Sequence, residues 1–400
     1  MTGLARFGLT LSPGEWGSWG IGEDSYSMLN RTALHEVHQK HGAKLAPFAG
    51  FELPLYYPSG ALKEHQLCRQ SAAIFDVSHM GQIEITDNTG SAQTILTALE
   101  ALIPSDLISL SPGQQRYGLL LTPDGGIMDD LMVMHMGSSV RLVVNAACVE
   151  QDFSWLHEHL ASCDLHRLSR SLVALQGPQA EAVLSGFVEG VDKLAFMQVG
   201  RFTYDGQDIE ISRSGYTGED GFEISLPDRL APPFVETLCA TGQADLAGLV
   251  ARDSLRLEAG LCLYGQDMDQ DISIVDASLG WAVGRARRTG GARSGGFFGA
   301  ARTLRELDQG GTYRRVGAAS LSGVPVRQGA AIYATEQATA KIGNVTSGSP
   351  APSVGHPVVM LRLLAGQTKS AGDMVCADVR GRRVVLTICD MPFFPHRFKR

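Results

Sequence analysis

Short blocks of apolar residues alternate with polar turns along the chain, and this pattern predicts more strands than long helices. The blocks 81–87 (GQIEITD) and 140–146 (VRLVVNA) predict strands because branched apolar residues dominate them. Residues 117–126 (YGLLLTPDGG) predict a strand that enters a turn at its Pro-Asp-Gly-Gly end. Residues 208–215 (DIEISRSG) and 222–227 (FEISLP) predict paired strands around a glycine-rich loop.

Helical periodicity first occurs in residues 30–42 (NRTALHEVHQKHG), where Leu34, Val37 and His38 share one face. Gly42 is expected to end this helix. Further helices are predicted in 149–161, 247–260 and 300–309, and a strand followed by a helix opened by Gly177-Pro178 in 172–187.

The sharpest change of composition is in residues 284–296 (GRARRTGGARSGG), which predict an exposed connector. Beyond it, one helix and many short strands separated by Gly, Pro and Ser predict a small β-barrel or sandwich. We therefore predict a flexible extension (1–30), an α+β body (31–290) and a C-terminal β domain (291–400). The irregular alternation and the lack of a G-x-G-x-x-G after a strand argue against a dinucleotide enzyme.

Composition excludes several classes of protein. With 400 residues, 44% of them hydrophobic, the chain can form two or three domains. A formal net charge of -8 argues against a nucleic-acid partner, and the absence of a run of about 18 apolar residues argues against a membrane span. Residues 1–27 contain three acids, one Arg and no signal-peptide core, so we expect a flexible leader with the natural start at Met28.

The seven cysteines are scattered and form no C-x-x-C pair, which is typical of reduced thiols in an intracellular protein. No His or Cys stands at a spacing that would complete a zinc site, so we expect no metal.

Two adjacent carboxylates, Asp129 and Asp130, precede an apolar run in "GGIMDDLMVMHM" (125–136). In a strand, Asp130 shares a face with Met132 while Asp129 lies on the opposite face, so the two are not a catalytic dyad. We expect Asp129 to close the preceding turn by accepting backbone N–H groups. Asp130, expected one step deeper, should meet a cation or a ligand with N–H groups.

Two further stretches contain candidate ligand-binding residues. In "SRSGYTGEDGFEIS" (212–225), glycines allow close backbone approach, Tyr216 offers a flat stacking surface, and Glu219, Asp220 and Glu223 supply acceptors, although an elaborate hairpin would use the same residues. Arg252 precedes Asp253 on a helix, which is typical of a solvated or intrahelical pair, but its apolar neighbours favour a buried charge partner or an anionic ligand.

No nucleophile elbow or Cys/His signature is present. The carboxylates, Tyr216, Asn145 and Arg252 instead indicate recognition of a flat, nitrogen-rich ligand.

Together these stretches resemble one family, the aminomethyltransferase or T-protein of the glycine cleavage system. The motifs stand in family order from about residue 31 to the end: GAKLAPFAGFELPLYY (42–57), FDVSHMGQIEI (75–85), GGIMDDLMV (125–133), VVNAA (143–147), LQGPQAE (175–181), SRSGYTGEDGFEI (212–224), ARDSLRLEAGLCLYGQDMD (251–269), LGWAVG (279–284) and VTSGSPAPSVGHPV (345–358).

The resemblance implies a three-domain cloverleaf of the α+β class: two interleaved ferredoxin-like α+β domains and a C-terminal β-barrel. It also implies transfer of the aminomethyl carbon from the lipoyl arm of H-protein to tetrahydrofolate, the co-substrate. The products are 5,10-methylenetetrahydrofolate, ammonia and dihydrolipoyl H-protein. The implied compartment is the cytoplasm of a bacterium or the mitochondrial matrix of a eukaryote.

The resemblance also assigns roles to individual residues. Asp130 matches the family's essential aspartate, which orients a folate nitrogen and helps to remove its proton. Glu223 matches the acid that binds the pterin-side N–H groups, and Arg252 matches an arginine of the folate site. Tyr216 and Trp281 match aromatic walls of the folate site. Further lining positions are matched by Tyr117, Asn145 and Met80.

Two positions depart from the family's pattern. Met134 stands where some members have Tyr, which removes one polar contact. The tail "MPFFPHRFKR" does not align cleanly, and we expect Arg397, ahead of His396, to supply the polar folate contact there.

Two other functions fit the same resemblance. One is a tetrahydrofolate-dependent demethylase of a small methylated amine or sulfonium compound, which would differ at the donor entrance. The other is a folate-binding protein without transferase activity. Such relatives carry a Lys-Gly-Cys motif where this chain reads "RLEAGLCLYGQ", which favours the transferase.

Overall fold

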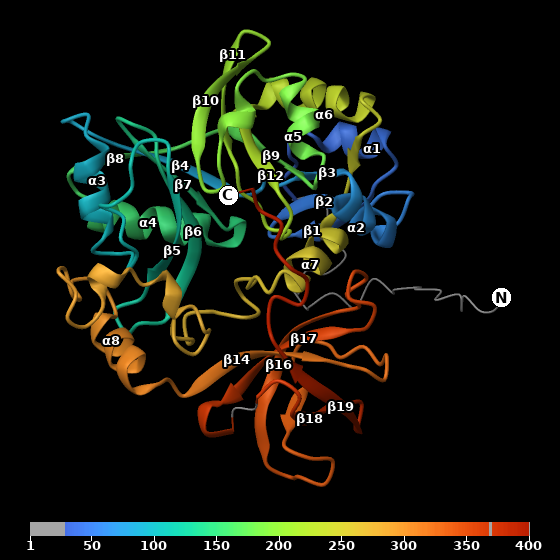
Figure 1. Ribbon diagram of the computed structural model, residues 1–400. Helices are drawn as coiled ribbons and strands as arrows, with labels where there is room; N and C mark the ends of the chain where they lie inside the picture. Colours follow the sequence, from blue (N-terminus) through green and yellow to red (C-terminus); the bar gives the residue numbers. More distant parts are fainter. Residues whose placement is uncertain (1–28, 368–369, 400) are drawn as a thin grey trace.

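The computed structural model describes residues 29–367 and 370–399, which form two large open β-sheets, a two-stranded sheet, a closed β-barrel and eight α-helices (Figure 1). The leader predicted in residues 1–27 lies outside the described residues. Within the described ranges, no helix combines the length and apolar character needed to cross a bilayer. The predicted α+β class is confirmed.

The first sheet has six strands in the order β10-β11-β12-β9-β3-β13. All neighbouring strands are antiparallel except β13, which runs parallel to β3. A separate hairpin, β1 (Lys44–Phe48) and β2 (Phe51–Tyr56), lies beside this sheet. The bounds are β3 Ala72–Asp76, β9 Arg170–Gln176, β10 Val199–Tyr204, β11 Gln207–Ser212, β12 Gly221–Pro227 and β13 Ala244–Leu246.

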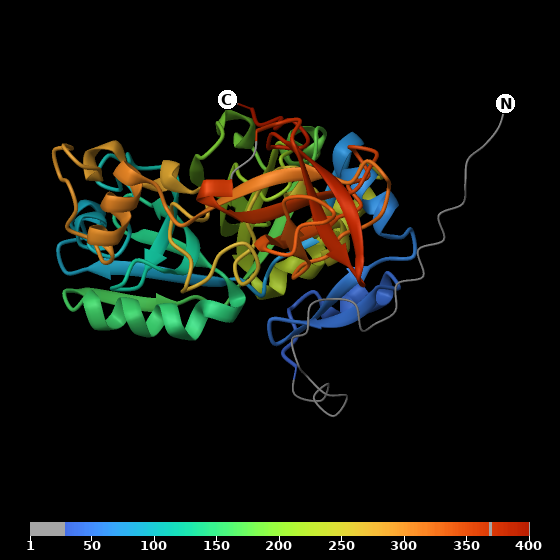
Figure 2. The same ribbon diagram turned by 90° about the horizontal axis from the view of Figure 1, so that it is seen from below.

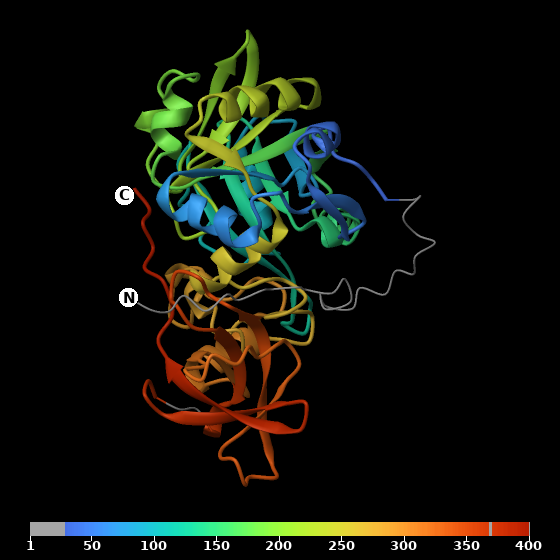
Figure 3. The same ribbon diagram turned by 90° about the vertical axis from the view of Figure 1, so that its right-hand side faces the viewer.

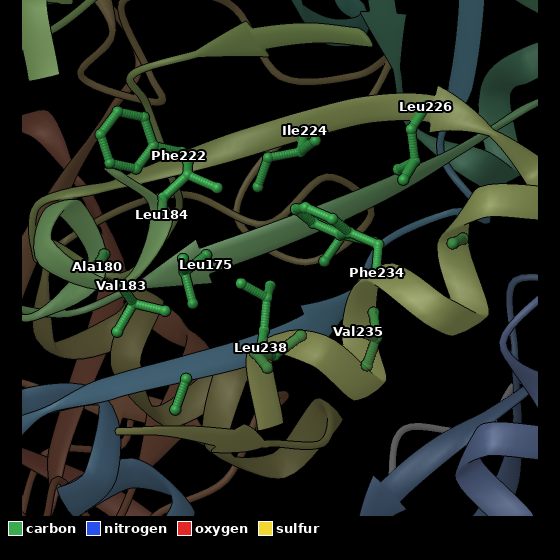
Figure 4. Packing of buried hydrophobic residues seen from close by; sticks show 14 of the residues in the cluster. Leu175, Ala180, Val183, Leu184, Phe222, Ile224, Leu226, Phe234, Val235 and Leu238 are labelled. Carbon is green, nitrogen blue, oxygen red and sulfur yellow. The ribbon is translucent and has the colours of Figure 1, made fainter. Parts of the chain in front are cut away.

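Strand alternation divides the first sheet into two apolar faces. Ile224 of β12 packs with Phe234 and Leu238 of α6 in one buried cluster (Figure 4). Phe75 and Ala174 point to the opposite face, which packs against α7 and the second sheet. The helices around this sheet are α1 His35–Lys40, α2 Ala61–Gln70, α5 Ala180–Ser185, α6 Ala231–Ala240 and α7 Leu249–Glu258.

The second sheet is antiparallel throughout, in the order β5-β6-β7-β4-β8. Helices α3 (Ala92–Leu99) and α4 (Val149–His159) contribute to a single buried cluster on one face, and Figure 2 shows α4 lying along that face. Because the chain leaves the first sheet after β3 and returns to it at β9, the two sheets are interleaved, as predicted. The bounds are β4 Gly81–Asp87, β5 Gln115–Leu121, β6 Ile127–His135, β7 Val140–Val144 and β8 Cys163–Arg167.

Residues 284–296, predicted to be an exposed connector, are instead folded onto the second sheet's side of the molecule. Arg287 is buried and donates to Glu100 at 2.9 Å, so its charge is neutralised by a residue far away in sequence. The prediction was wrong for Arg287, because glycine and arginine content alone does not reveal such a partner, whereas six residues of the segment are exposed. Helix α8 (Ala300–Gln309) follows at the predicted position.

The C-terminal strands close into a barrel of order β14-β17-β16-β15-β18-β19, which confirms the predicted β-barrel. Figure 3 shows the last residues running from the barrel back to the first sheet, where Phe398 stacks on Phe196 with ring centroids 4.1 Å apart. The domain boundary placed at residue 290 remains a prediction. The strand bounds are β14 Tyr313–Ala319, β15 Ala331–Tyr333, β16 Lys341–Ser349, β17 Val358–Leu364, β18 Met374–Val379 and β19 Arg382–Cys389.

Candidate active site

Asp130 lies on β6 with its side chain on the face that is not covered by α3 and α4. The Tyr117 hydroxyl donates to Asp130 Oδ2 at 3.0 Å, and Asn145 Nδ2 donates to Asp130 Oδ1 at 2.7 Å. Tyr117 comes from the neighbouring strand β5 and Asn145 follows directly after β7. Three adjacent strands therefore hold the carboxylate between two neutral donors.

The start of β6 is fixed by a close backbone approach. A Cβ on Gly126 would lie 1.6 Å from the carbonyl oxygen of Gln270, so only glycine fits there. The Ile127 N–H donates to the carbonyl of Ile272 at 3.1 Å. The glycine of the "GGIMDD" motif thus sets the position from which Asp129 and Asp130 enter the sheet.

Asp129 differs from the prediction in two respects. It is fully buried, whereas Asp130 is partly exposed, so the expected order of depth was wrong. Its oxygens accept the Asn145 backbone N–H at 3.0 Å and Asn145 Nδ2 at 2.8 Å. The turn is closed instead by Thr122, whose carbonyl and hydroxyl accept the N–H groups of Gly125 and Gly126 at 3.0 Å each. The predicted placement of the two acids on opposite faces is confirmed.

The electrostatics of Asp130 are unusual for a carboxylate. Burial, together with the nearby Asp129, raises the pKa of Asp130 to about 7, and the hydrogen bonds from Tyr117 and Asn145 oppose the rise. No salt bridge reaches Asp130 from any residue that the structure describes. The group is therefore suited to exchange a proton near neutral pH.

Aromatic side chains stand beside this carboxylate. The Trp281 and Tyr117 rings stack with centroids 5.3 Å apart and an interplanar angle of 27°. Trp281 is 63% exposed, so one face of the stack is open to solvent. Tyr216, in the glycine-rich loop, donates its hydroxyl proton to the carbonyl of Cys262. These rings provide flat surfaces for a planar ligand.

Arg252 and Glu223 lie next to Tyr216. The Arg252 guanidinium carbon is 4.8 Å from the Tyr216 ring centroid, and the guanidinium makes no ion pair with any described residue. Asp253 instead pairs with Arg256 at 2.8 Å, so the intrahelical Arg252–Asp253 pair is not formed. Burial lowers the pKa of Arg252, and the Glu223 carboxylate acts against that shift. Arg252 is thus a cation with unused donors beside an acid.

Glu223 also borders a narrow cavity between the two sheets. Its carboxylate accepts the Ser214 hydroxyl at 2.8 Å. Met134, on the Asp130 face of β6, lines the same cavity, and Met80 packs against the apolar cluster to which Met134 belongs. The remaining lining side chains are Gln82, Arg141, Val143, Leu172, Val199, Glu210, Ser212 and Ser225.

Arg397 lies apart from the other candidates. Its backbone N–H donates to the carbonyl of Gly218 at 2.8 Å, and its guanidinium lies 3.6 Å from Glu219 and over the Phe394 ring at 4.7 Å. It makes no contact with Asp130, Arg252 or Glu223 within the described residues. His396, the alternative, donates from Nε2 to the carbonyl of Ala259 at 2.8 Å. The tail therefore reaches the glycine-rich loop but not the Asp130 carboxylate.

Two residues near the site were not predicted. His79 is buried, with its ring edge-on to Phe48 at 5.6 Å, and burial lowers its pKa to about 4. Asp152 is fully buried on α4, and neither of its carboxyl oxygens has a hydrogen-bond partner among the described residues; burial and the charge of Asp129 raise its pKa to about 10. Asp152 stands on the apolar stripe of its helix, three residues after Val149 and four before Leu156. An acid within an apolar stripe indicates a buried carboxyl group, and this could have been predicted from the sequence.

Comparison with known proteins agrees with this architecture. The family model described as the GCVT N-terminal domain matches residues 34–287, and the glycine cleavage T-protein C-terminal barrel domain matches residues 314–395. The mitochondrial aminomethyltransferase of Dictyostelium discoideum is 38% identical, with 94% of this chain and 95% of that protein covered. The mitochondrial aminomethyltransferase of Pisum sativum is 36% identical, with 93% and 91% covered.

Among solved structures, the glycine cleavage system aminomethyltransferase T from Bartonella henselae superposes with a TM-score of 0.86. It is 40% identical to this chain, and the match covers 93% of this chain and all of that one. Three comparisons agree: two family models match, the relatives align over nearly their whole length, and the fold is shared with a solved structure. The chain belongs to the glycine cleavage T-protein family and is an enzyme of the aminomethyltransferase class.

Proposed function

We propose that the chain transfers the aminomethyl carbon from the lipoyl arm of H-protein to tetrahydrofolate, with Asp130 as the catalytic residue. The observation that carries this proposal is the environment of Asp130. A carboxylate held by two neutral donors, with its pKa raised to about 7, can accept a proton at the pH of the cell. A purely structural acid would have a cation or several backbone donors instead.

In this mechanism Asp130 orients an N–H group of the folate and accepts its proton as the nitrogen bonds to the aminomethyl carbon. The same carboxylate stabilises the positive charge that develops on the nitrogen. Tyr117 and Asn145 keep the carboxylate in place, since each donates one hydrogen bond to a different oxygen. Ammonia and dihydrolipoyl H-protein are the other products.

The remaining candidates suit the other parts of the folate. Glu223 accepts the N–H groups of the pterin, because an ionised carboxylate is an acceptor only. Arg252, whose guanidinium is unpaired among the described residues, offers a planar fork to a carboxylate or carbonyl. Tyr216 and Trp281 provide stacking surfaces, and Met80 with Met134 provides an apolar wall. Arg397 is proposed as a contact of the ligand's outer end, since its side chain is exposed.

The donor and compartment follow from the family. Lipoylated H-protein is the proposed partner, and neither nucleic acid nor a membrane is required. The relatives named above from Dictyostelium discoideum and Pisum sativum are mitochondrial, and we propose the mitochondrial matrix for a eukaryotic source and the cytoplasm for a bacterial one.

The test is the glycine-cleavage reaction reconstituted with lipoylated H-protein and tetrahydrofolate, with methylenetetrahydrofolate as the measured product. A parallel reaction supplies a free methylated amine or sulfonium compound as donor. Turnover with H-protein and none with the free donors supports the proposal. Turnover with a free donor alone would mean that the chain is a demethylase, and folate binding without turnover would mean a non-enzymatic role.

A further inference from the structure

Behind Asp130, on the α4 side of β6, two more carboxyl groups are enclosed. Asp129 of β6 and Asp152 of α4 both have 0% exposure, and the negative charge of Asp129 acts on the Asp152 carboxyl group. No salt bridge reaches either acid from residues 29–367 or 370–399. Over the same residues, no three His, Cys, Asp or Glu side chains are arranged to hold a metal ion. Two adjacent carboxyl groups in such a place share a proton, because a second buried negative charge is too costly.

The hydrogen bonds decide which acid holds that proton. Asp129 already accepts from Asn145 at both oxygens, at 3.0 Å from the backbone N–H and at 2.8 Å from Nδ2. Donors at both oxygens favour the ionised form, because each hydrogen bond is stronger to a carboxylate than to a carboxylic acid. Asp152 has no donor to either oxygen within the described part of the chain. The proton therefore belongs to Asp152, whose O–H donates to Asp129.

Asn145 connects this pair to Asp130. Its backbone N–H and its Nδ2 both point at Asp129, which fixes the orientation of the carboxamide. The same Nδ2 donates to Asp130 Oδ1 at 2.7 Å. A rotated carboxamide would present its oxygen to two carboxylates and is excluded by repulsion. Asp129 thus accepts from both Asp152 and Asn145, and Asn145 also donates to Asp130, so the four residues form a continuous set of hydrogen bonds with one possible assignment of donors.

We propose that Asp152 and Asp129 are positioning residues that share one proton and, through Asn145, orient Asp130 and control its proton affinity. This inference rests on the proposed role of Asp130. Neither acid of the pair touches the reacting atoms.

The surroundings of the pair favour the protonated state. Burial is the main cause of a raised pKa at Asp152, and the negative charge of Asp129 adds to it. Burial also raises the pKa of Asp129, against the hydrogen bonds that it receives. The titratable groups that face the pair are all acidic or neutral: Asp130, Cys148 and Tyr264, with Tyr117 beyond Asp130 and Asp269 beyond Tyr264.

The first test measures the proton directly. The infrared spectrum of the intact protein at pH 8 should contain the carbonyl-stretch band of a protonated carboxylic acid. In the difference spectrum between wild type and Asp152→Asn this band should be lost. A matched control, Glu158→Gln, changes an exposed acid of the same helix and should leave the band unchanged. A band of equal size in wild type and Asp152→Asn would overturn the shared proton.

The second test measures the pH profile of kcat. Asp152→Asn should keep kcat within twofold of wild type, because an amide donates to Asp129 as the protonated acid does. The acidic limb, the part of the profile where kcat rises with pH, should stay at the same pH. Asp129→Asn should lower kcat at least tenfold and shift the acidic limb, because its amide nitrogen would face the donors of Asn145. A normal kcat and limb in Asp129→Asn would overturn the positioning role. Equal losses in both variants would overturn the assignment of the proton to Asp152.

Asp152→Leu provides the same measurement if Asp129→Asn fails to fold. It removes the donor to Asp129 while Asp129 and Asn145 stay in place, and it should shift the acidic limb and lower kcat severalfold. An unshifted limb would again contradict the positioning role. Failure of the proposed function would be recognised separately. Full activity in Asp130→Asn would remove the proposed role of Asp130, whereas the infrared result for the pair would stand.

Discussion

Trp281 stacks on Tyr117, with ring centroids 5.3 Å apart and Trp281 largely exposed. The Tyr117 hydroxyl in turn donates to Asp130 at 3.0 Å. A ligand that covers the open face of the indole would therefore bury the stack and further desolvate the carboxylate. Tyr117 thus links the exposed Trp281 ring to Asp130, and the proposed ligand stacking and proton transfer would both act through this side chain.

Asp130→Asn should lower kcat by about 100-fold while folate affinity and the melting temperature stay close to wild type. Asparagine keeps the shape and loses the proton acceptor, and general-base catalysis contributes ~10²–10⁴-fold. Turnover is measured in the reconstituted reaction and affinity by folate fluorescence titration. Asp124→Asn, in the exposed turn before β6, is the control and should be silent. Equal effects of the two substitutions would contradict the role of Asp130.

The pH dependence of kcat/KM should have an acidic limb near pH 7. Asp130 accepts a proton only when ionised, and its pKa is raised to about 7, so activity rises with pH through that value and levels off above it. Tyr117→Phe should move the limb to higher pH, because the Tyr117 hydrogen bond lowers the pKa of Asp130. A limb that stays in place when Tyr117 is changed would mean that another group titrates.

Trp281→Ala should raise the KM for tetrahydrofolate about fivefold, since an aromatic pair contributes ~0.5–1.5 kcal/mol. Stability should change little, because the side chain is mostly exposed. Trp281→Phe should restore most of the affinity. Calorimetry and steady-state kinetics separate the two effects. A large loss of thermal stability in Trp281→Ala would show that the indole supports the fold rather than the ligand.

Much of the fold followed from periodicity. Side chains alternate between the two faces of a strand, and this alternation predicted Asp129 and Asp130 on opposite faces, since it depends only on the local backbone. The sequence could not reveal which face is more enclosed, because α3 and α4 cover the Asp129 face by tertiary packing. The expected depth of the two acids was wrong for that reason.

Partners distant in sequence were also beyond prediction. Arg256, one helical turn after Arg252, is fully buried and donates to Asp267 at 2.8 Å and to Ser347 at 3.0 Å. Arg252, four residues earlier, remains without an ion pair to the described residues. The two arginines look alike in sequence, and the packing of the barrel against α7 gives Arg256 a partner, Ser347, that Arg252 does not have.

Arg252→Lys should lower kcat/KM for tetrahydrofolate at least tenfold, which corresponds to about 1.4 kcal/mol, the value of one charge-assisted hydrogen bond. Lysine keeps the charge but loses the planar fork and its contact with the Tyr216 ring. Arg305→Lys, an exposed arginine on α8, is the matched control and should have no effect. Wild-type kinetics in Arg252→Lys would remove Arg252 from the binding site.

Asp152→Asn should stabilise the protein increasingly as pH rises from 5 to 8. Burial raises the pKa of Asp152 above its unfolded value, so over this range the folded state holds a proton that the unfolded state has released. The free energy of unfolding of the wild type therefore falls with pH, by at most about 1.4 kcal/mol per pH unit for this proton. Asparagine mimics the protonated acid and does not titrate, so the difference in melting temperature should be small at pH 5 and largest at pH 8. Calorimetry of both proteins across this range measures it, with Glu158→Gln as the exposed control. A difference that is constant with pH would mean that Asp152 releases its proton in the folded state as readily as in the unfolded chain.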